Sequence, residues 1–253
     1  MKFKITNLNI AGLQGTVTSA PEPYGNIYGK SGVYALYMDV LRDSGTPDRI
    51  LVIFQEDKLN RATLPTTIDE RLNPEDEKAW VSLIKEGSII EVTGVLQTHK
   101  NKVTGRTQLF VWADYIADKS NESDNIRNIQ MNVAYIKGVI EKTPHYKVTS
   151  KGIHITEFSL RIPSIFTPGY YSYIPCITWQ KIADRAKELK EGTVVTIDGR
   201  IQKRDYWKNY NDGTEKRFST WEVSISKLDA ETENCSFGES KPVGSISSQI
   251  NEK

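Results

Sequence analysis

Residues 189–202 read LKEGTVVTIDGRIQ, and residues 84–97 read IKEGSIIEVTGVLQ. The likeness extends further, because Gly15 in AGLQGTV matches Gly138 in AYIKGVI. An internal repeat of this length predicts that one structural unit occurs twice. The chain of 253 residues has room for two such units of roughly 100–150 residues, the usual size of a domain.

The first copy contains an insertion. Gly15 and Gly138 are 123 residues apart. Gly94 and Gly199 are only 105 residues apart, so the first copy holds 18 more residues than the second. The segment 59–76 is polar and contains turn residues, so we expect it to be this insertion and to form a loop.

Polar composition marks the segments outside the two copies. Residues 119–130, KSNESDNIRNIQ, are almost free of apolar residues and are expected to be a linker. Residues 231–253 are rich in Ser, Gly, Asn and Glu, and they bury too little apolar surface to offset the entropy of ordering. The predicted organisation is a first unit at 1–118, the linker, a second unit at 131–230 and a disordered tail.

Both copies show the two-residue periodicity of a half-buried strand. A glycine stands in the apolar row each time, where it allows the sharp bend that small closed barrels require. The rows are Ile90, Val92, Gly94 and Leu96 in the first copy and Val195, Ile197, Gly199 and Ile201 in the second.

A short amphipathic helix is expected before each of these strands. Residues 179–192 space their apolar side chains at helical intervals and end on Gly192. Residues 73–87 begin with Asn73 as a helix N-cap and end on Gly87. Glycine-bent strands with one short helix in each unit of about 100 residues predict an all-β fold class, two tandem OB folds.

Two longer stretches of the second unit match a known pattern. They are GVIEKTPHYKVTSKGIHITEFSLRI, 138–162, and YIPCITWQKIADRAKELKEGTVVTIDGRIQKRDY, 173–206. They resemble the opening strands and the centre of the bacterial single-stranded DNA-binding protein family, whereas the first unit resembles it only through the repeat. The resemblance implies OB barrels that bind single-stranded DNA. It also implies a homodimer, since four barrels would then act together.

The second unit has the residue types that bind single strands without reading sequence, namely aromatic rings for stacking and cations for phosphates. Both types alternate in 203–218, KRDYWKNYNDGTEKRF, around an Asp-Gly hairpin turn. The alternative is a solvated hairpin whose aromatic rings pack back on the barrel. The resemblance implies stacking at or near Phe166, Tyr173, Trp179 and Tyr206. The other candidate DNA contacts in the hairpin are Lys203, Arg204, Trp207, Lys208, Tyr210, Lys216 and Arg217.

Charge distinguishes the two units. Residues 131–230 hold 16 Lys and Arg against 11 Asp and Glu, while residues 1–120 hold 14 against 15. The second unit is therefore the expected partner of nucleic acid, although an excess of this size is also ordinary for a unit of this length. The first unit has Asn101 where the second has Tyr206. Its candidate contacts are Phe54, which we match to Trp179, and Lys100, Lys102 and Arg106.

Other function classes lack support in the sequence. His99, His145 and His154 have no Cys or acidic partner at metal-ligand spacing, and no HExxH, GxSxG or GxxxxGK[ST] motif occurs. We therefore expect no catalytic residues, no metal and no cofactor. No apolar run approaches the ~20 residues of a membrane helix, and the two cysteines form no disulfide framework. We expect a cytoplasmic protein of the bacterial nucleoid, or one encoded by a phage or plasmid in a bacterial host.

The predicted function is to coat and protect single-stranded DNA in replication, recombination or repair. Two alternatives remain open. One is an OB-fold module for protein interaction or scaffolding, such as an accessory primosome or conjugation factor. The other is RNA binding, since stacking platforms do not by themselves distinguish the sugar.

Overall fold

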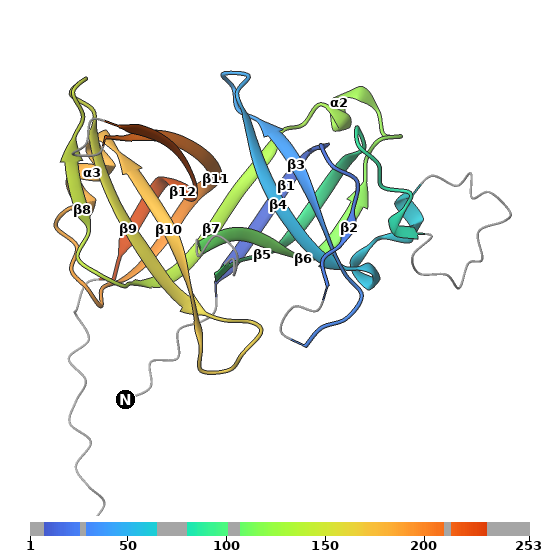
Figure 1. Cartoon of the computed structure of the whole chain (residues 1–253), viewed down its shortest axis with the longest axis horizontal. Helices are drawn as coiled ribbons and strands as arrows, with labels where there is room; N and C mark the ends of the chain where they lie inside the picture. The colour runs from blue at the N-terminus through green and yellow to red at the C-terminus, as the bar shows by residue number, and fades with distance from the viewer. Residues whose placement is uncertain (1–7, 26–28, 65–79, 101–106, 210–213, 232–253) are drawn as a thin grey trace, which may run out of the picture.

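Two β-barrels lie side by side in the computed structural model of the chain (Figure 1). It describes residues 8–25, 29–64, 80–100, 107–209 and 214–231, except for the side chains of residues 100 and 207–209. The first barrel is formed within residues 9–118 and the second within residues 131–230.

The first barrel is a closed five-stranded sheet with one short extra strand, β2. Its main strand β1 pairs antiparallel with both β3 and β5, and the barrel closes through a parallel pair between β4 and β6. In that closing pair Val52 lies opposite Val111. The strands are β1 (Asn9–Val17), β2 (Glu22–Pro23), β3 (Val33–Leu41), β4 (Pro47–Gln55), β5 (Ile89–Lys100) and β6 (Thr107–Asp118).

The second barrel repeats this topology. Strand β7 pairs with β9 and β11, and a parallel pair between β10 and β12 closes the barrel, with Cys176 opposite Val223. The prediction of two tandem OB folds is therefore confirmed. The elements are β7 (Met131–Ile140), β8 (His145–Val148), β9 (His154–Pro163), β10 (Tyr171–Trp179), α3 (Gln180–Ala186), β11 (Val194–Asn209) and β12 (Glu215–Ala230).

The two predicted glycine bends coincide with irregularities in the strand pairing. The register shifts at Gly94 on β5 and at Gly199 on β11, as a β-bulge does. A Cβ atom on Gly94 would lie 2.1 Å from the carbonyl oxygen of Trp112, and one on Gly199 would lie 2.5 Å from that of Ser224. Both strands therefore pass so close to a neighbouring backbone that a side chain has no room.

The two predicted helices agree only in part with the structure. Helix α3 lies in the predicted segment 179–192. Residues 73–79 of the predicted helix at 73–87 lie outside the described part, Trp80 and Val81 are helical, and residues 82–87 are turns and irregular backbone, so the helix ends six residues before Gly87. No helix within the described residues is long and apolar enough to span a membrane.

The segments between elements differ in part from expectation. The predicted loop insertion 59–76 contains the short 3₁₀ helix η2 (Arg61–Thr63), which follows η1 (Glu56–Lys58), and residues 65–76 lie outside the described part. The predicted linker holds one helical turn, α2 (Asp124–Arg127). The amide of Gln14 on β1 donates to the carbonyl of Ile126, which connects this turn to the first barrel. The tail beyond residue 231 is not described.

The barrels join edge to edge. Strands β1 and β7 pair antiparallel, with Ala11 opposite Ala134, so one sheet continues through both barrels. The side chain of Asn9 bonds the backbone N–H and carbonyl of Leu96, at 3.0 and 2.8 Å. Asn132 bonds the same two groups of Ile201, at 2.9 and 2.7 Å. The repeat therefore extends to matching hydrogen bonds beside the junction.

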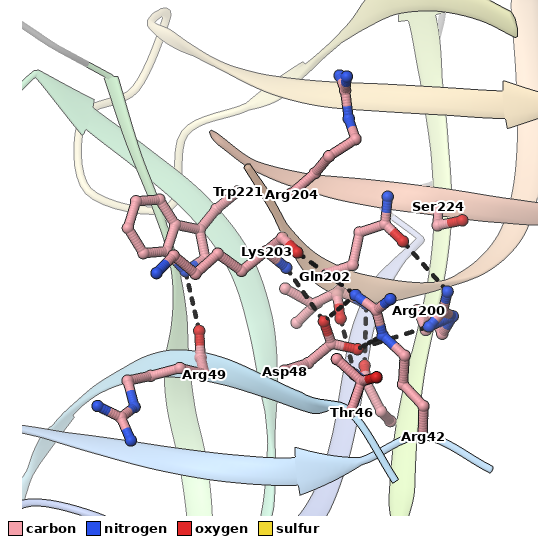
Figure 2. Close-up of polar contacts among 12 residues, drawn as sticks. Arg42, Thr46, Asp48, Arg49, Arg200, Gln202, Lys203, Arg204, Trp221 and Ser224 are labelled. Carbon is pink, nitrogen blue, oxygen red and sulfur yellow. Dashed lines mark hydrogen bonds and ion pairs between the residues drawn. The ribbon is translucent and has the colours of Figure 1, made fainter. Parts of the chain in front are cut away.

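A buried carboxylate also links the barrels (Figure 2). Asp48 on β4 is fully buried and accepts hydrogen bonds from the guanidinium of Arg42 at 2.5 and 2.8 Å. From the second barrel it receives the backbone N–H of Lys203 at 3.1 Å, and the guanidinium of Arg200 lies at 3.5 Å. A buried carboxylate is costly unless it is paired and hydrogen-bonded, so these contacts hold the two barrels in one arrangement.

Candidate nucleic-acid interface

A cavity of about 750 Å³ opens on the second barrel, and strands β8 to β12 supply most of its walls. Tyr173 on β10 and Tyr206 on β11 line it, with 42% and 40% of their surfaces exposed. Strand alternation explains Tyr173, because its neighbours Ser172 and Ile174 are buried on the opposite face. Exposed rings on the wall of a cavity suit stacking against nucleobases.

An ion network shares the cavity lining with the two tyrosines. Arg204 donates to Glu222 at 2.6 and 3.0 Å and to Glu157 at 2.6 Å. Lys147 donates to Glu157 at 2.9 Å, and the amide of Gln202 donates to Glu222 at the same distance. The charge of Arg204, predicted to contact phosphate, is thus already paired within the protein.

The charges of the network stabilise each other. The hydrogen bond to Glu222 raises the pKa of Arg204 against the opposing effect of burial. Burial opposes ionisation of Glu157, but Lys147 and Arg204 outweigh it and hold the pKa of Glu157 below its ordinary value. The lining contains three cationic and three acidic side chains, so its formal charge is zero. They are Lys142, Lys147, Arg204, Glu141, Glu157 and Glu222.

Two aromatic side chains of the hairpin of β11 and β12, Tyr206 and Phe218, contact each other outside the buried core. The ring of Tyr206 stacks on Phe218, 5.7 Å between centroids, and the guanidinium of Arg204 lies 5.6 Å from the centre of the Tyr206 ring. Lys216 and Arg217 are exposed, and Arg217 pairs with Asp205 at 2.5 Å. Trp207 and Lys208 lie on β11, but their side chains, like the whole of Tyr210, are outside the described part.

Two further candidates lie outside the cavity lining. Trp179, at the end of β10, is half-buried, and its Nε1 donates to the hydroxyl of Ser224 at 3.1 Å. Lys203 lies at the junction of the barrels, where its Nζ is 5.6 Å from the centre of the Trp221 ring (Figure 2). Trp221 in turn donates from Nε1 to the carbonyl of Arg49 in the first barrel at 2.8 Å.

The assignment of Phe54 to the DNA interface is wrong. Phe54 is 0% exposed and belongs to the core of the first barrel. Val52 pairs with Val111 where the first barrel closes, and Cys176 pairs with Val223 where the second barrel closes, so Val52 and Cys176 occupy equivalent positions. By this alignment Phe54 corresponds to Thr178, and Gln55 corresponds to Trp179. The sequence match was one residue out of register, and such a slip moves a side chain to the other face of the strand.

Phe166, predicted to be at or near a base platform, lies outside the cavity lining. Phe166 lies in the loop between β9 and β10, and its ring packs against the first barrel. It meets Trp112 edge-on at 4.9 Å between centroids and stacks on Phe110 at 6.3 Å. These contacts explain why the ring is half-buried.

The remaining first-unit candidates are outside the described part, namely the side chain of Lys100 and all of Lys102 and Arg106. His99, on β5, is half-buried, and burial lowers its pKa, so the ring is neutral near pH 7. Its Nε2 lies 3.1 Å from the hydroxyl of Tyr24. Within the described ranges, no three His, Cys, Asp or Glu side chains are grouped to hold a metal ion.

The acidic residues of the cavity, chiefly Glu157 and Glu222, were not predicted from the sequence. Both stand in strands of alternating polarity, HITEFSL and TWEVSI, at positions facing away from the apolar row. That alternation could have placed them on the face of Tyr173 and Arg204, since paired strands share their faces.

Comparison with known proteins agrees with this geometry. The family model described as "Single-strand binding protein family" matches residues 131–230. "Single-stranded DNA-binding protein 2" of Listeria monocytogenes is 31% identical over 112 residues, which are 41% of this chain and 68% of that protein. "Single-stranded DNA-binding protein 3" of Listeria innocua is 32% identical over 126 residues, 48% of this chain and 72% of that protein.

The whole chain also has similar solved structures. The wild-type single-stranded DNA-binding protein of Thermus aquaticus superposes with a TM-score of 0.62 and 17% identity, covering 92% of this chain and 97% of that one. A deletion mutant of the same protein gives a TM-score of 0.64, also at 17% identity, covering 93% and 98%. At this identity the likeness shows the fold, and it includes both barrels.

Proposed function

We infer, from the fact that this chain belongs to the single-strand binding protein family, that it binds single-stranded DNA in the cavity of the second barrel. The observation that carries this proposal is the pair of exposed rings, Tyr173 and Tyr206, on the walls of one cavity. Bases of any identity present a flat face to such rings, so binding is expected to tolerate many sequences.

The proposed role is to coat and protect single strands that arise in replication, recombination or repair in the bacterial cytoplasm. The relatives named above come from bacteria and are named for binding single-stranded DNA. The proposal includes no catalytic step.

Phosphate contacts are proposed for the rim of the cavity. The charges of the lining itself balance. Lys216 and Arg217 are exposed on the hairpin that carries Tyr206, where Arg217 also pairs with Asp205. In this proposal the bases of the DNA bind inside the cavity and its phosphates bind along the edge. Of the other hairpin candidates, Trp207, Lys208 and Tyr210 belong to the same proposal.

A homodimer is proposed as the working assembly. Ile10 on β1 and Tyr135 on β7 lie opposite each other in the ladder that joins the barrels, and Val133 lies two residues from Tyr135 on the same face. All three side chains are exposed, so apolar surface crosses the junction on the outside of the sheet. A second copy of the chain would cover this face and bring four barrels together. Light scattering should give twice the chain mass, and Val133→Asp should reduce it to one chain mass.

A fluorescence titration tests the DNA-binding proposal. Oligo-dT should quench the intrinsic fluorescence, and affinity should fall with salt at a slope of about −0.7 for each neutralised phosphate. Tyr206→Ala should weaken binding by about 1–3 kcal/mol, the effect of losing one stacking platform. Ser226→Ala, on the same barrel but outside the cavity lining, is a control that should leave affinity unchanged.

Two results of the titration would contradict the proposal. Equal affinity for duplex DNA of the same length would exclude a single-strand site. No change in fluorescence and no retention of oligo-dT would favour an interaction module instead. A parallel titration with oligo-rU tests whether the protein prefers DNA or RNA, because oligo-rU differs from oligo-dT only in the sugar and in one methyl group on each base.

A further inference from the structure

The first barrel carries a closed apolar cluster where the second barrel has its cavity. Matching the closing strand pairs, Val52–Val111 and Cys176–Val223, shows which positions are equivalent. The ion network of the second barrel is replaced by apolar side chains and a neutral histidine. The positions of Glu157, Arg204 and Glu222 are occupied in the first barrel by Ala35, His99 and Phe110.

The second barrel covers part of this cluster. Phe110 and Trp112 are buried beneath Phe166, whose ring reaches across from the loop between β9 and β10. Figure 1 shows this loop, in yellow, on the side of the second barrel that faces the first. The face of the first barrel that corresponds to the DNA cavity is therefore used to hold a loop of its own chain.

Polar contacts fasten both ends of the same loop. Gln97 on β5 is fully buried, and its Oε1 accepts from the hydroxyl of Ser172 at 2.8 Å and from the backbone N–H of Ile165 at 3.4 Å. The next residue, Thr98, accepts from the backbone N–H of Tyr173 at 3.2 Å. The first barrel thus holds the backbone of Tyr173 itself, as well as the residues before it.

We propose that the first barrel positions Tyr173 for base stacking, with Gln97 and Phe166 as positioning residues. This inference rests on the proposed function, since it assigns a use to the barrel beside the DNA cavity. The exposed ring of Tyr173 lies on the wall of that cavity, so its orientation depends on where its backbone is held. Holding the backbone in place lowers the entropy lost when a base stacks on the ring.

A double-mutant cycle tests this coupling in the full-length chain. Gln97→Met keeps the volume of the side chain but removes the acceptor for Ser172. Tyr173→Ala should weaken oligo-dT binding about 5- to 150-fold, the range for one stacking platform. Gln97→Met alone should weaken it about 2- to 10-fold, the range for one hydrogen bond. When Tyr173 is already alanine, Gln97→Met should change affinity less than about 2-fold.

Two more variants make the experiment specific. Gln14→Met is the matched control, because Gln14 is another buried glutamine of the first barrel and its amide donates to the carbonyl of Ile126. It should leave affinity unchanged. If Gln97→Met does not fold, Ser172→Ala removes the same hydrogen bond from the other side and should reproduce the cycle.

The outcomes separate this inference from the proposed function. Equal losses from Gln97→Met with and without Tyr173 would overturn the positioning role while leaving DNA binding intact. A wild-type chain that binds no oligo-dT would overturn the proposed function, and the inference with it. An effect of Gln97→Met that disappears in the Tyr173→Ala background supports both.

Discussion

Replacing Arg204 with methionine tests the ion network in the cavity lining. Glu222 is buried and accepts from Arg204 at 2.6 and 3.0 Å, and from the amide of Gln202. In Arg204→Met the Glu222 carboxylate keeps the amide but loses its cation. Removing one partner of a buried ion pair costs about 3–5 kcal/mol. We expect Arg204→Met to lower the free energy of unfolding by about 3 kcal/mol, the lower end of this range, because solvent screens the partly exposed end of the network at Glu157.

Urea unfolding near neutral pH measures this loss. The double variant Arg204→Met/Glu222→Gln is the control, because it removes the buried charge together with its partner. It should recover at least half of the lost free energy of unfolding. A double variant no more stable than Arg204→Met would refute the argument that an uncompensated carboxylate causes the loss.

The loss of stability in Arg204→Met relative to the wild type should depend on pH. The pKa of Glu157 is held low in the folded protein by Lys147 and Arg204 in spite of burial. A lowered pKa gives stability that is present above the unfolded value, about 4.3 for Glu, and is lost as the pH falls through the folded value. Because Arg204→Met removes part of that lowering, its deficit should be largest near neutral pH and shrink below about pH 4. A deficit that grows in acid would contradict this account.

Three other predictions concern the core, the bends and the two units. Phe54→Ala should cost about 3–5 kcal/mol in urea unfolding, as a deleted core aromatic does, and leave the oligo-dT affinity of the folded protein unchanged. Gly94→Ala should lower the free energy of unfolding by about 1–3 kcal/mol, because the added Cβ would clash with a backbone oxygen. Gly12→Ala is the control and should lower it less, because the nearest atom to its Cβ belongs to a side chain, 3.1 Å away. Isolated 131–230 should bind oligo-dT more tightly than isolated 1–120 in the fluorescence titration, and the opposite ranking would show that the DNA site was assigned to the wrong barrel.

The fold was predictable because the internal repeat, the glycines within the strands and the short helix predicted in 179–192 all indicate an OB barrel. Alternation around Gly94 and Gly199 identifies strands, and the bend at each glycine needs only local information. Phe54 was misplaced for a physical reason. It ends the apolar run LVIF, 51–54, in which every side chain is buried. Polar and apolar residues therefore do not alternate there, and only the pairing with a distant strand shows which face of the strand Phe54 lies on.

The candidate site was only partly predictable. Tyr173 and Tyr206 follow from the family pattern, and both line the cavity. The contacts of Phe166 and Gln97 join residues that are far apart in the chain and in different barrels, and no local pattern reports them. The balanced charge of the cavity does not follow from the net charge of the second unit, because most of the charged residues of that unit lie outside the cavity lining.

The ladder between β1 and β7 belongs to a single polypeptide. Its formation is therefore unimolecular, and the local concentration of one barrel near the other is set by the short segment between them, on the order of millimolar for short flexible connections. Dilution cannot separate these two barrels, whereas it separates any pair held only by association between chains. A cell holding few copies of the protein would still have every Tyr173 beside the Gln97 of its own chain.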